Sequence, residues 1–471
     1  MPTTLAPAPP VAPTHAKRQA PVAVVVAAAS LPVFMATLDN LVLISALPVV
    51  QRDLEATVSQ LSWFLNAYTL AFATFMLPAA TLGDRWGRRR TMIGGLTVFT
   101  VASIAAALST SSESLIAARA LQGLGAAAIM PLSLALLASA VPPEKRAAAI
   151  GAWGGISGLG VALGPVLGGA VVEGFGWQAI FWLNVPVALI ALPLLVVAVP
   201  ESRGTWSRLD PVGTLMLGGA VFGGILALVR GHDEGWGSVS VAGALVVAAL
   251  LLPCYGLWAR GRAHAVLPLR LFASRGFSVA NVIGLTFSLG MFGAVFLLSQ
   301  YLQVVEGYSP LEAGVRTLPW TAAPMVVAPL AGALAPRTGL RALLVTGLGL
   351  QAGALVWFAW LTENASPYAV FVVPLALAGI GMGLTFAPST TAVLDGLREA
   401  DFAVASSANS TVREFGVALG VALLTAVFLG NGGTISPTGY DGAIGPALLA
   451  GAAAIVVALI AAGFAPGRGR R

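Results

Sequence analysis

Residues 21–50 read PVAVVVAAASLPVFMATLDNLVLISALPVV, an apolar run in which Asp39 is the only charged residue. The run is long enough to cross a lipid bilayer, because a spanning helix needs about 20 apolar residues. An ionised carboxylate at the centre of such a helix costs roughly 3 kcal/mol to insert. The stretch therefore predicts a membrane-spanning helix in which Asp39 has a functional or structural task.

The rest of the chain has the same character. Apolar residues make up 57% of it and charged residues 9%, with a mean hydropathy of +0.88, whereas soluble domains carry about 25% charged residues. The sequence predicts an all-α polytopic membrane protein with about fourteen spanning helices. The apolar runs lie near 22–50, 58–82, 91–110, 114–141, 146–171, 178–199, 211–230, 238–259, 276–304, 312–335, 341–361, 367–393, 402–429 and 442–464.

Basic residues predict the orientation, because short cytoplasmic loops retain Lys and Arg. If both termini are cytoplasmic, all Lys and Arg fall on the cytoplasmic side except Arg52, Arg230 and Arg316 in outer loops and Arg119 and Arg413 in the membrane. We therefore predict a multi-pass protein of the cell inner (plasma) membrane. The same distribution explains the pI of about 10.0, and no basic stripe alternates with aromatic residues, so we expect no nucleic-acid partner.

The sequence does not indicate a disulfide, a metal site or an enzyme active site. Cys254 is the only cysteine, which excludes an internal disulfide, and His15, His232 and His264 fall in the tail or in loops. No metal-ligand cluster, nucleophile motif or phosphate-binding loop is present. We expect no metal, no cofactor and no enzymatic activity, with a proton gradient as the energy source.

The chain also contains an internal repeat. The segment Ala80–Arg89 is echoed by Gly332–Arg341, and Leu121–Gly125 by Leu377–Gly381, at nearly the same offset. Two such matches suggest two homologous six-helix halves related by an axis along the membrane normal. We predict a disordered cytoplasmic tail over 1–20, an N-terminal half over 21–200, two inserted helices over 201–262 and a C-terminal half over 263–471.

Five motifs resemble a known family. Leu82–Arg90 resembles the loop signature between helices two and three of the major facilitator superfamily, and Arg119–Gly125 resembles its helix-four signature. The glycine spacing over 151–169 resembles the antiporter motif of that superfamily. Two further stretches, 38–48 and 177–186, resemble its fourteen-helix drug:proton antiporters. The resemblance implies two six-helix halves plus two inserted helices, and proton-coupled export.

Asp39 and Arg119 are the first candidates for proton coupling. Removal from water disfavours the charged form of a carboxyl group, so Asp39 could exchange a proton and link that event to cargo binding. The alternative is a permanently paired structural carboxylate. Arg119 is the obvious partner, although it lies about 9 Å shallower by helix rise, and it could instead bind carbonyl groups of helix one. Arg413 and Glu414 are a second pair of charges within the membrane. Glu414 is a candidate for a second proton site, and the alternative is a salt-bridged packing element.

Two other groups of residues have candidate roles that the resemblance implies. Asp84, with Arg85, Gly87 and Arg88, is expected to act as a conformational switch by contacting the positive N-terminus of the helix that begins near Phe402. The helix-five glycines are expected to pack closely against a neighbour and to block proton leak, with a kink at the proline. These residues are Gly151, Gly160, Gly164, Pro165, Gly168 and Gly169.

Polar and aromatic side chains in the predicted spans are candidates for lining a substrate cavity. They are Asn40, Asn66, Tyr68, Gln122, Gln300, Tyr301, Trp320, Phe386 and Asn409. The sequence thus predicts a monomeric, proton-coupled exporter of hydrophobic drug-like compounds. Two alternatives stay open: a dedicated exporter of one metabolite or antibiotic, and a transporter-like membrane sensor that does not transport.

Overall fold

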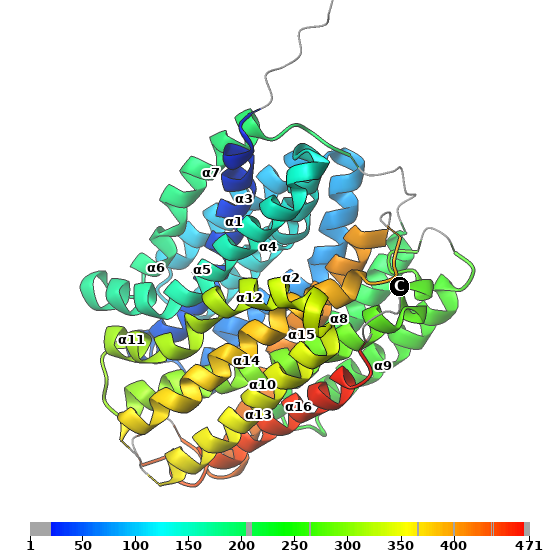
Figure 1. Cartoon of the computed structure of the whole chain (residues 1–471). Helices are drawn as coiled ribbons and strands as arrows, with labels where there is room; N and C mark the ends of the chain where they lie inside the picture. The colour runs from blue at the N-terminus through cyan, green and yellow to red at the C-terminus, as the bar shows by residue number, and fades with distance from the viewer. Residues whose placement is uncertain are drawn as a thin grey trace, which may run out of the picture.

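The computed structural model describes residues 20–465 except 204–209, 263–264, 365–366, 399–400, 435 and 437. Every regular element in this part of the chain is a helix (Figure 1). The helices of the first half of the chain are α1 Val22–Leu54, α2 Val58–Trp86, α3 Arg88–Ala107, α4 Ser112–Ala140, α5 Pro143–Phe175, α6 Ala179–Trp182, α7 Asn184–Ala198, α8 Pro211–Asp233 and α9 Val239–Ala259. The others are the 3-10 helix η1 Leu269–Ala273, α10 Arg275–Val304, α11 Pro310–Thr321, α12 Ala323–Thr338, α13 Leu340–Glu363, α14 Tyr368–Leu394, α15 Phe402–Gly430 and α16 Ile444–Ala462.

The prediction of an all-α membrane protein is confirmed, whereas the count of fourteen spans stays a prediction. In the described residues, 11 helices are long and apolar enough to cross a membrane, with α6 and α7 counted together as Ala179–Ala198. Two shorter apolar segments, Leu163–Phe175 and Pro211–Ala227, lie within α5 and α8. The tenth predicted span is divided between α11 and α12 at Ala322, where Pro324 cannot donate a backbone hydrogen bond to the preceding turn.

Residues 1–19 and 466–471 lie outside the described part of the chain, and so does the predicted tail apart from Ala20.

The first five long helices and α7 pack together: α1 lies against α5, α2 and α3 against α4, and α7 against α1 and α3. A second group packs in the same way later in the chain, with α10 against α15 and α16, and α13 against α14 and α16. Both groups are visible in Figure 1.

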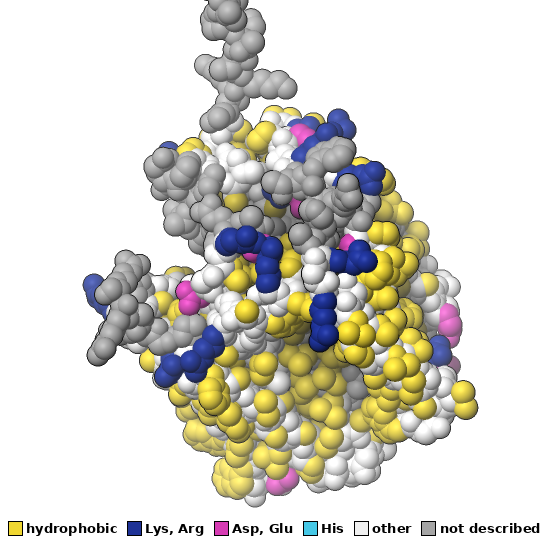
Figure 2. Space-filling view, turned by 90° about the vertical axis from the view of Figure 1, so that its right-hand side faces the viewer, with side chains coloured by type: hydrophobic (Ala, Val, Ile, Leu, Met, Phe, Trp, Pro, Cys, Tyr) yellow, Lys and Arg dark blue, Asp and Glu magenta, His cyan; other side chains and the backbone are white. Residues whose placement is uncertain are grey.

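Several contacts join the two groups, and three of them are the most extensive. Helix α11 packs along α5, α2 packs along α15, and α8 lies against both α2 and α15 while its partner α9 lies against α8. Leu70 and Ala73 of α2, Ile225 of α8 and Ala418 of α15 form a small apolar cluster at the second junction. In Figure 2, Lys and Arg side chains lie in the upper and middle parts of the view, and apolar surface covers much of its lower part.

Candidate functional site

Asp39 and Arg119 form an ion pair deep in the first group of helices. The Arg119 Nη1 atom donates a hydrogen bond to Asp39 Oδ2, and the side chains of Arg119 and Asp39 are 0% and 1% exposed, respectively. Helix α1 supplies the acid and α4 the base. A charge that is buried without a partner is strongly destabilising. The pair therefore fixes α1 and α4 in the position where their two charges meet.

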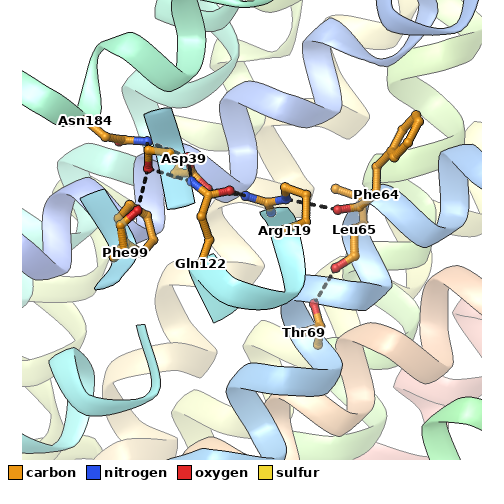
Figure 3. A network of polar contacts seen from close by, with 9 residues as sticks. Asp39, Phe64, Leu65, Thr69, Phe99, Arg119, Gln122 and Asn184 are labelled. Atoms are coloured by element: carbon orange, nitrogen blue, oxygen red, sulfur yellow. Dashed lines mark hydrogen bonds and ion pairs between the residues drawn. The ribbon is translucent and has the colours of Figure 1, made fainter. Parts of the chain in front are cut away.

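Amide side chains complete the environment of the carboxylate (Figure 3). Asp39 Oδ1 accepts hydrogen bonds from Asn184 Nδ2 at 2.7 Å and from Gln122 Nε2 at 3.1 Å. Both amides also donate to Ser103 Oγ, at 3.2 Å from Asn184 and 2.8 Å from Gln122. Asp39 therefore joins α1 to α4 and α7, and Ser103 binds the two amides to α3.

Arg119 is further fixed by α2. Its Nε donates to the backbone oxygen of Phe64 at 3.0 Å, and its Nη1 also donates to Gln122 Oε1 at 2.8 Å. The Arg119 guanidinium carbon lies 4.5 Å from the centre of the Tyr68 ring, a cation–π contact. The structure thus contains the direct pair with Asp39, and the carbonyl that Arg119 binds belongs to α2 and not to helix one. Arg119 Nη2 is buried without a hydrogen-bond partner.

The ion pair depends on the negative charge of Asp39. Protonation would remove the charge that attracts Arg119 and leave a buried guanidinium with neutral neighbours. Because an unpaired buried guanidinium is unfavourable, the charge of Asp39 helps to hold α4 against α1.

Arg413 and Glu414 are placed differently. Both are half-buried near the middle of α15, and neither forms an ion pair with a described residue. The Arg413 guanidinium carbon lies 4.3 Å from the centre of the Phe386 ring in α14, and the Glu414 carboxylate interacts electrostatically with Tyr68 in α2. The two side chains interact electrostatically with each other, and each also has a neighbour of its own, as a rotation of about 100° between successive helix residues allows.

The loop between α2 and α3 contains the predicted switch residues. Asp84 Oδ1 accepts a hydrogen bond from Arg88 Nε at 2.7 Å, and Arg85 is exposed. Gly87 has a φ of +118°, and a side-chain methyl there would lie 2.7 Å from the carboxyl carbon of Glu201. Within the described residues, Asp84 forms no hydrogen bond or ion pair with α15.

Glu201 caps the start of α3. Its Oε1 accepts the backbone N–H of Arg89 at 2.9 Å and its Oε2 that of Arg90 at 3.3 Å. A carboxylate stabilises the positive end of a helix, so the segment that follows α7 is bound to the α2–α3 loop. No local pattern in the sequence points to Glu201, because its partners are 112 and 111 residues away.

The N-terminus of α15 carries no side-chain cap. Asp401 is the N-cap residue, but its side chain makes no capping hydrogen bond and binds Arg270 and Arg398 instead. Burial by itself raises the pKa of the Asp401 carboxyl, but hydrogen bonds from Arg398 and Arg270 outweigh burial and lower that pKa below its usual value. The Asp401 side chain therefore does not cap the first N–H groups of α15, which have no partner within the helix.

The glycines of α5 face two different helices. A side-chain methyl would lie 3.0 Å from Phe34 O at Gly160, 2.6 Å from Leu41 Cβ at Gly164 and 3.0 Å from Val42 Cα at Gly168. These three glycines therefore let α5 approach α1 closely.

Gly169 faces α11 instead. A methyl there would lie 2.3 Å from the backbone oxygen of Pro310, and a methyl at Gly314 of α11 would lie 2.2 Å from that of Pro165. The two helices are in backbone contact at these positions, which joins the two groups of helices. Gly151 lies in the first third of α5.

The predicted cavity residues do not form one surface. Tyr68 and Gln122 belong to the Asp39 network, and Asn66 is buried in α2 with its amide nitrogen unpartnered. Asn40 is half-buried in α1. Asn409 donates to the backbone oxygen of Ala280 at 3.3 Å, which ties α15 to α10.

The remaining predicted cavity residues lie in the second group of helices. Gln300 is buried and donates weakly to the oxygen of Phe296 in its own helix at 3.5 Å. Tyr301 packs against Phe371 and Tyr440 in an aromatic cluster. Phe386 packs edge-on against Phe287.

Trp320 lines a small pocket between α1, α5, α10 and α11. Its other walls combine apolar residues with the hydroxyl-bearing residues Ser45, Ser299, Thr317 and Thr321. No charged side chain lines this pocket among the described residues. Of the predicted cavity residues, only Trp320 contributes to it.

The sequence alone assigns no role to Asn184 and Ser103, which belong to the Asp39 network. Asn184 lies within a stretch that is notable for its family resemblance, whereas Ser103 lies in an apolar run and gives no signal. Across the described part of the chain, no group of three His, Cys, Asp or Glu side chains is placed so that it could hold a metal ion.

Comparisons with known proteins agree with this architecture. The family model described as Major Facilitator Superfamily matches residues 29–421. The chain is 33% identical over 444 residues to the "Tetracenomycin C resistance and export protein" of Streptomyces glaucescens, covering 93% of this chain and 82% of the relative. It is 34% identical over 421 residues to the "Methylenomycin A resistance protein" of Streptomyces coelicolor, covering 88% of this chain and 87% of the relative.

Solved structures share the fold. The crystal structure of an auto-inhibited POT family peptide transporter superposes with a TM-score of 0.65 at 16% identity, over 93% of this chain and 96% of that chain. A bacterial homologue of the human lysosomal transporter Spinster, in an inward-facing and unoccupied conformation, gives a TM-score of 0.62 at 18% identity, over 94% and 96%. The family model covers most of the chain, and relatives at 33% and 34% identity are matched over most of their length, so this multi-pass membrane protein belongs to the Major Facilitator Superfamily.

Proposed function

We propose that this protein exports hydrophobic, drug-like compounds from the cytoplasm in exchange for protons. The resistance and export proteins that it resembles support the export of small molecules. The observation that carries proton coupling is the fully buried Asp39, bound by Arg119, Gln122 and Asn184 at the junction of four helices. Membrane carboxylates in such positions commonly take part in proton transfer.

In the proposed cycle, Asp39 alternates between ionised and protonated forms. The ionised form keeps Arg119 and the two amides in place, and the protonated form releases Arg119 and allows α1 and α4 to move. Cargo and proton then favour different conformations and so exchange across the membrane. Glu414 is a candidate for a second proton site, because it lies half-buried in α15 and interacts with Tyr68 beside Arg119.

The available driving force is sufficient for this task. A membrane potential of 100 mV supplies about 2.3 kcal/mol for each charge moved, and one pH unit adds about 1.4 kcal/mol. Together they can maintain a cargo gradient of about tenfold or more.

We infer that the conformation described here is closed on the outer side. Gln303 at the end of α10 donates to the backbone oxygen of Ser45 in α1 at 3.2 Å, and α5 contacts α11 through Gly169 and Gly314. The pocket beside Trp320 lies next to these contacts. Its apolar and hydroxyl lining is suited to the end of a cargo path for hydrophobic compounds.

We also propose two six-helix halves, each with its own packed group, and α8 with α9 as an inserted pair. The recurrence of similar helix neighbours in both groups supports this division. The three spans beyond the 11 would come from α5, α8 and the α11–α12 pair, which would give fourteen. The proposed protein is monomeric, resides in the inner (plasma) membrane and has both termini in the cytoplasm.

The topology can be tested directly. Single cysteines at Thr4, at Arg471 and at Glu234 between α8 and α9, in a Cys254→Ser background, should report accessibility in intact cells. We expect an impermeant thiol reagent to label only the Glu234 position from outside, because the other two positions are cytoplasmic. Labelling of Thr4 and Arg471 from opposite sides would contradict this topology.

Asp84→Asn should shift the protein toward the inward-open conformation. In the outward-open state, the Asp84 carboxylate would meet the uncapped N-terminus of α15, and an amide interacts less strongly with that positive end. The contact contributes roughly 0.3–1 kcal/mol, so we expect the inward-to-outward ratio to rise about two- to fivefold. Distances between spin labels at Arg90 and Arg337 measure that ratio.

Asp395→Asn is the matched control for Asp84→Asn. It removes an equal charge from the C-cap of α14, and within the described residues Asp395 forms no ion pair. We expect its distance distribution to match that of the wild type. Identical distributions for Asp84→Asn and the wild type would count against the switch.

The overall function is tested by reconstituting the protein in liposomes and recording proton movement against a panel of cationic, neutral and anionic compounds. An antiporter moves protons when, and only when, a cargo is supplied. Proton movement with many unrelated compounds supports multidrug export, and movement with one compound supports a dedicated exporter. A protein that moves neither cargo nor protons would support the sensor alternative.

A further inference from the structure

Arg413 is a cation in the middle of a spanning helix. It lies 11 residues from the start of α15 at Phe402, or roughly 16 Å along the helix axis. Its side chain is only half-buried. A guanidinium at this depth is energetically costly and requires a partner.

The surrounding helices do not supply that partner. Arg413 contacts α10 and α14, and neither of these helices nor α16 contains an Asp or Glu. Glu414, the adjacent acid, interacts electrostatically with Arg413 and with Tyr68 of α2, but it forms no ion pair with Arg413. Within the described residues, the positive charge of Arg413 is therefore not neutralised by a salt bridge.

The neighbourhood of Arg413 has a definite shape. Its guanidinium carbon lies 4.3 Å from the centre of the Phe386 ring, which packs edge-on against Phe287 with ring centres 5.6 Å apart. A methyl at Gly284 would lie 3.0 Å from Arg413 Cγ, so the absence of a side chain there makes room for the arginine stem. The Asn409 amide is occupied by α10.

We propose that Arg413 and Phe386 form a cargo subsite for a carboxylate or similar anionic group attached to an aromatic ring. This inference rests on the proposed export function and specifies the chemical class of compound. The guanidinium can bind a carboxylate through two parallel hydrogen bonds. The half-buried Phe386 ring provides an aromatic face for the rest of the molecule.

A cargo of this class supplies what the protein lacks at this position. When the anion binds, the charge of Arg413 is neutralised away from bulk water, where the ion pair is strengthened. A neutral analogue of the same shape gains only the ring contact. The subsite therefore distinguishes compounds by charge, and this preference should depend on Arg413.

A matched pair of probes tests the subsite. We would measure equilibrium binding of 2-naphthoate and of 2-naphthamide, which share a ring and differ in charge, to the purified full chain in nanodiscs with no gradient. We expect wild-type protein to bind the naphthoate about tenfold or more tightly than the amide. In Arg413→Gln the ratio of the two affinities should fall toward one, and Arg413→Lys should give an intermediate ratio.

Two further variants separate the parts of the subsite. Phe386→Leu should weaken both naphthyl probes but leave binding of cyclohexanecarboxylate unchanged, because that probe has no aromatic ring. Arg316→Gln is the control: Arg316 also stacks on an aromatic ring, at 3.6 Å from the Tyr308 centre, but has an acidic neighbour in Glu312 at 4.0 Å. We expect it to keep the wild-type ratio. Measurable naphthamide binding by Arg413→Gln would show that this variant is folded.

Three results would overturn the inference: equal affinity of the wild type for both probes, a preference that survives in Arg413→Gln, or displacement of naphthoate by chloride at similar concentration. The last would indicate a general anion site with no aromatic selectivity. Because binding is measured without a gradient, an Arg413-dependent preference would stand even if liposomes showed no proton exchange. Proton exchange without that preference would leave the export proposal intact and remove only the subsite.

Discussion

Asp39→Asn is expected to abolish export driven by a pH gradient while the protein remains folded in the membrane. The amide has the size of the acid and can still accept a hydrogen bond from Arg119, but it cannot ionise. Arg119 also keeps its bonds to Phe64 O and Gln122 Oε1 and its contact with Tyr68. Proteoliposomes with an imposed pH gradient measure the effect as loss of cargo accumulation above the equilibrium level.

Exchange of cargo without a gradient provides the control for Asp39→Asn. Labelled and unlabelled cargo should still exchange across the membrane, because that process requires movement of the helices but no net proton transfer. Asp53→Asn, a matched change in the outer end of α1, should accumulate cargo as the wild type does. If Asp39→Asn accumulates cargo normally under a pH gradient, Asp39 is a structural carboxylate and the coupling site lies elsewhere.

Gly164→Leu is expected to have the second large effect, a loss of export together with a proton leak. Even the first carbon of the new side chain would lie 2.6 Å from Leu41 Cβ, so α5 and α1 must separate. Overpacking of this kind costs about 1–3 kcal/mol or more and opens a path next to the helix that carries Asp39. The measurement is the rate at which an imposed pH gradient collapses in liposomes without any cargo.

The same helix offers the control for Gly164→Leu. Gly174 lies near the end of α5, and a side chain there would meet nothing within 4 Å among the described residues, so Gly174→Leu should neither leak nor lose export. Gly164→Ala, which adds only the first carbon, should give a weaker leak and keeps the test informative if the leucine variant fails to fold. A Gly164→Leu protein that exports normally and retains the pH gradient would show that this glycine face does not form a proton seal.

Several features of the protein are determined by its sequence alone. Long apolar runs can satisfy their backbone hydrogen bonds in a bilayer only as helices or as closed barrels, so fold class and most helix positions follow from composition and run length. A charge inside such a run is expensive, which singles out Asp39, Arg119, Arg413 and Glu414 without any coordinates. The family also follows from local motifs, because each of them lies within a few turns of one helix or loop.

The partners of those charges are decided only by the tertiary structure. Helix rise places Arg119 about 9 Å shallower than Asp39, yet the two side chains are in contact, because helix tilt and the length of an arginine side chain do not appear in a count of residues. The Phe64 carbonyl and Asn184 reach the pair from two other helices, and Ser103 of α3 binds the amide of Asn184. Asn184 is separated from Asp39 by 145 residues of chain, so their contact arises from helix packing, which no local pattern encodes.

The packing of distant helices also explains why Arg413 and Glu414 differ from the Asp39–Arg119 pair. Arg413 and Glu414 are neighbours in sequence and interact electrostatically, but each also has a neighbour from another helix, Phe386 for Arg413 and Tyr68 for Glu414. The α5 glycines likewise form one motif in the sequence, whereas the structure divides them between α1 and α11. Sequence determines which residues need a partner in the membrane, and the packing of distant helices determines which partner each one has, because side-chain direction depends on the rotation and tilt of every helix in the bundle.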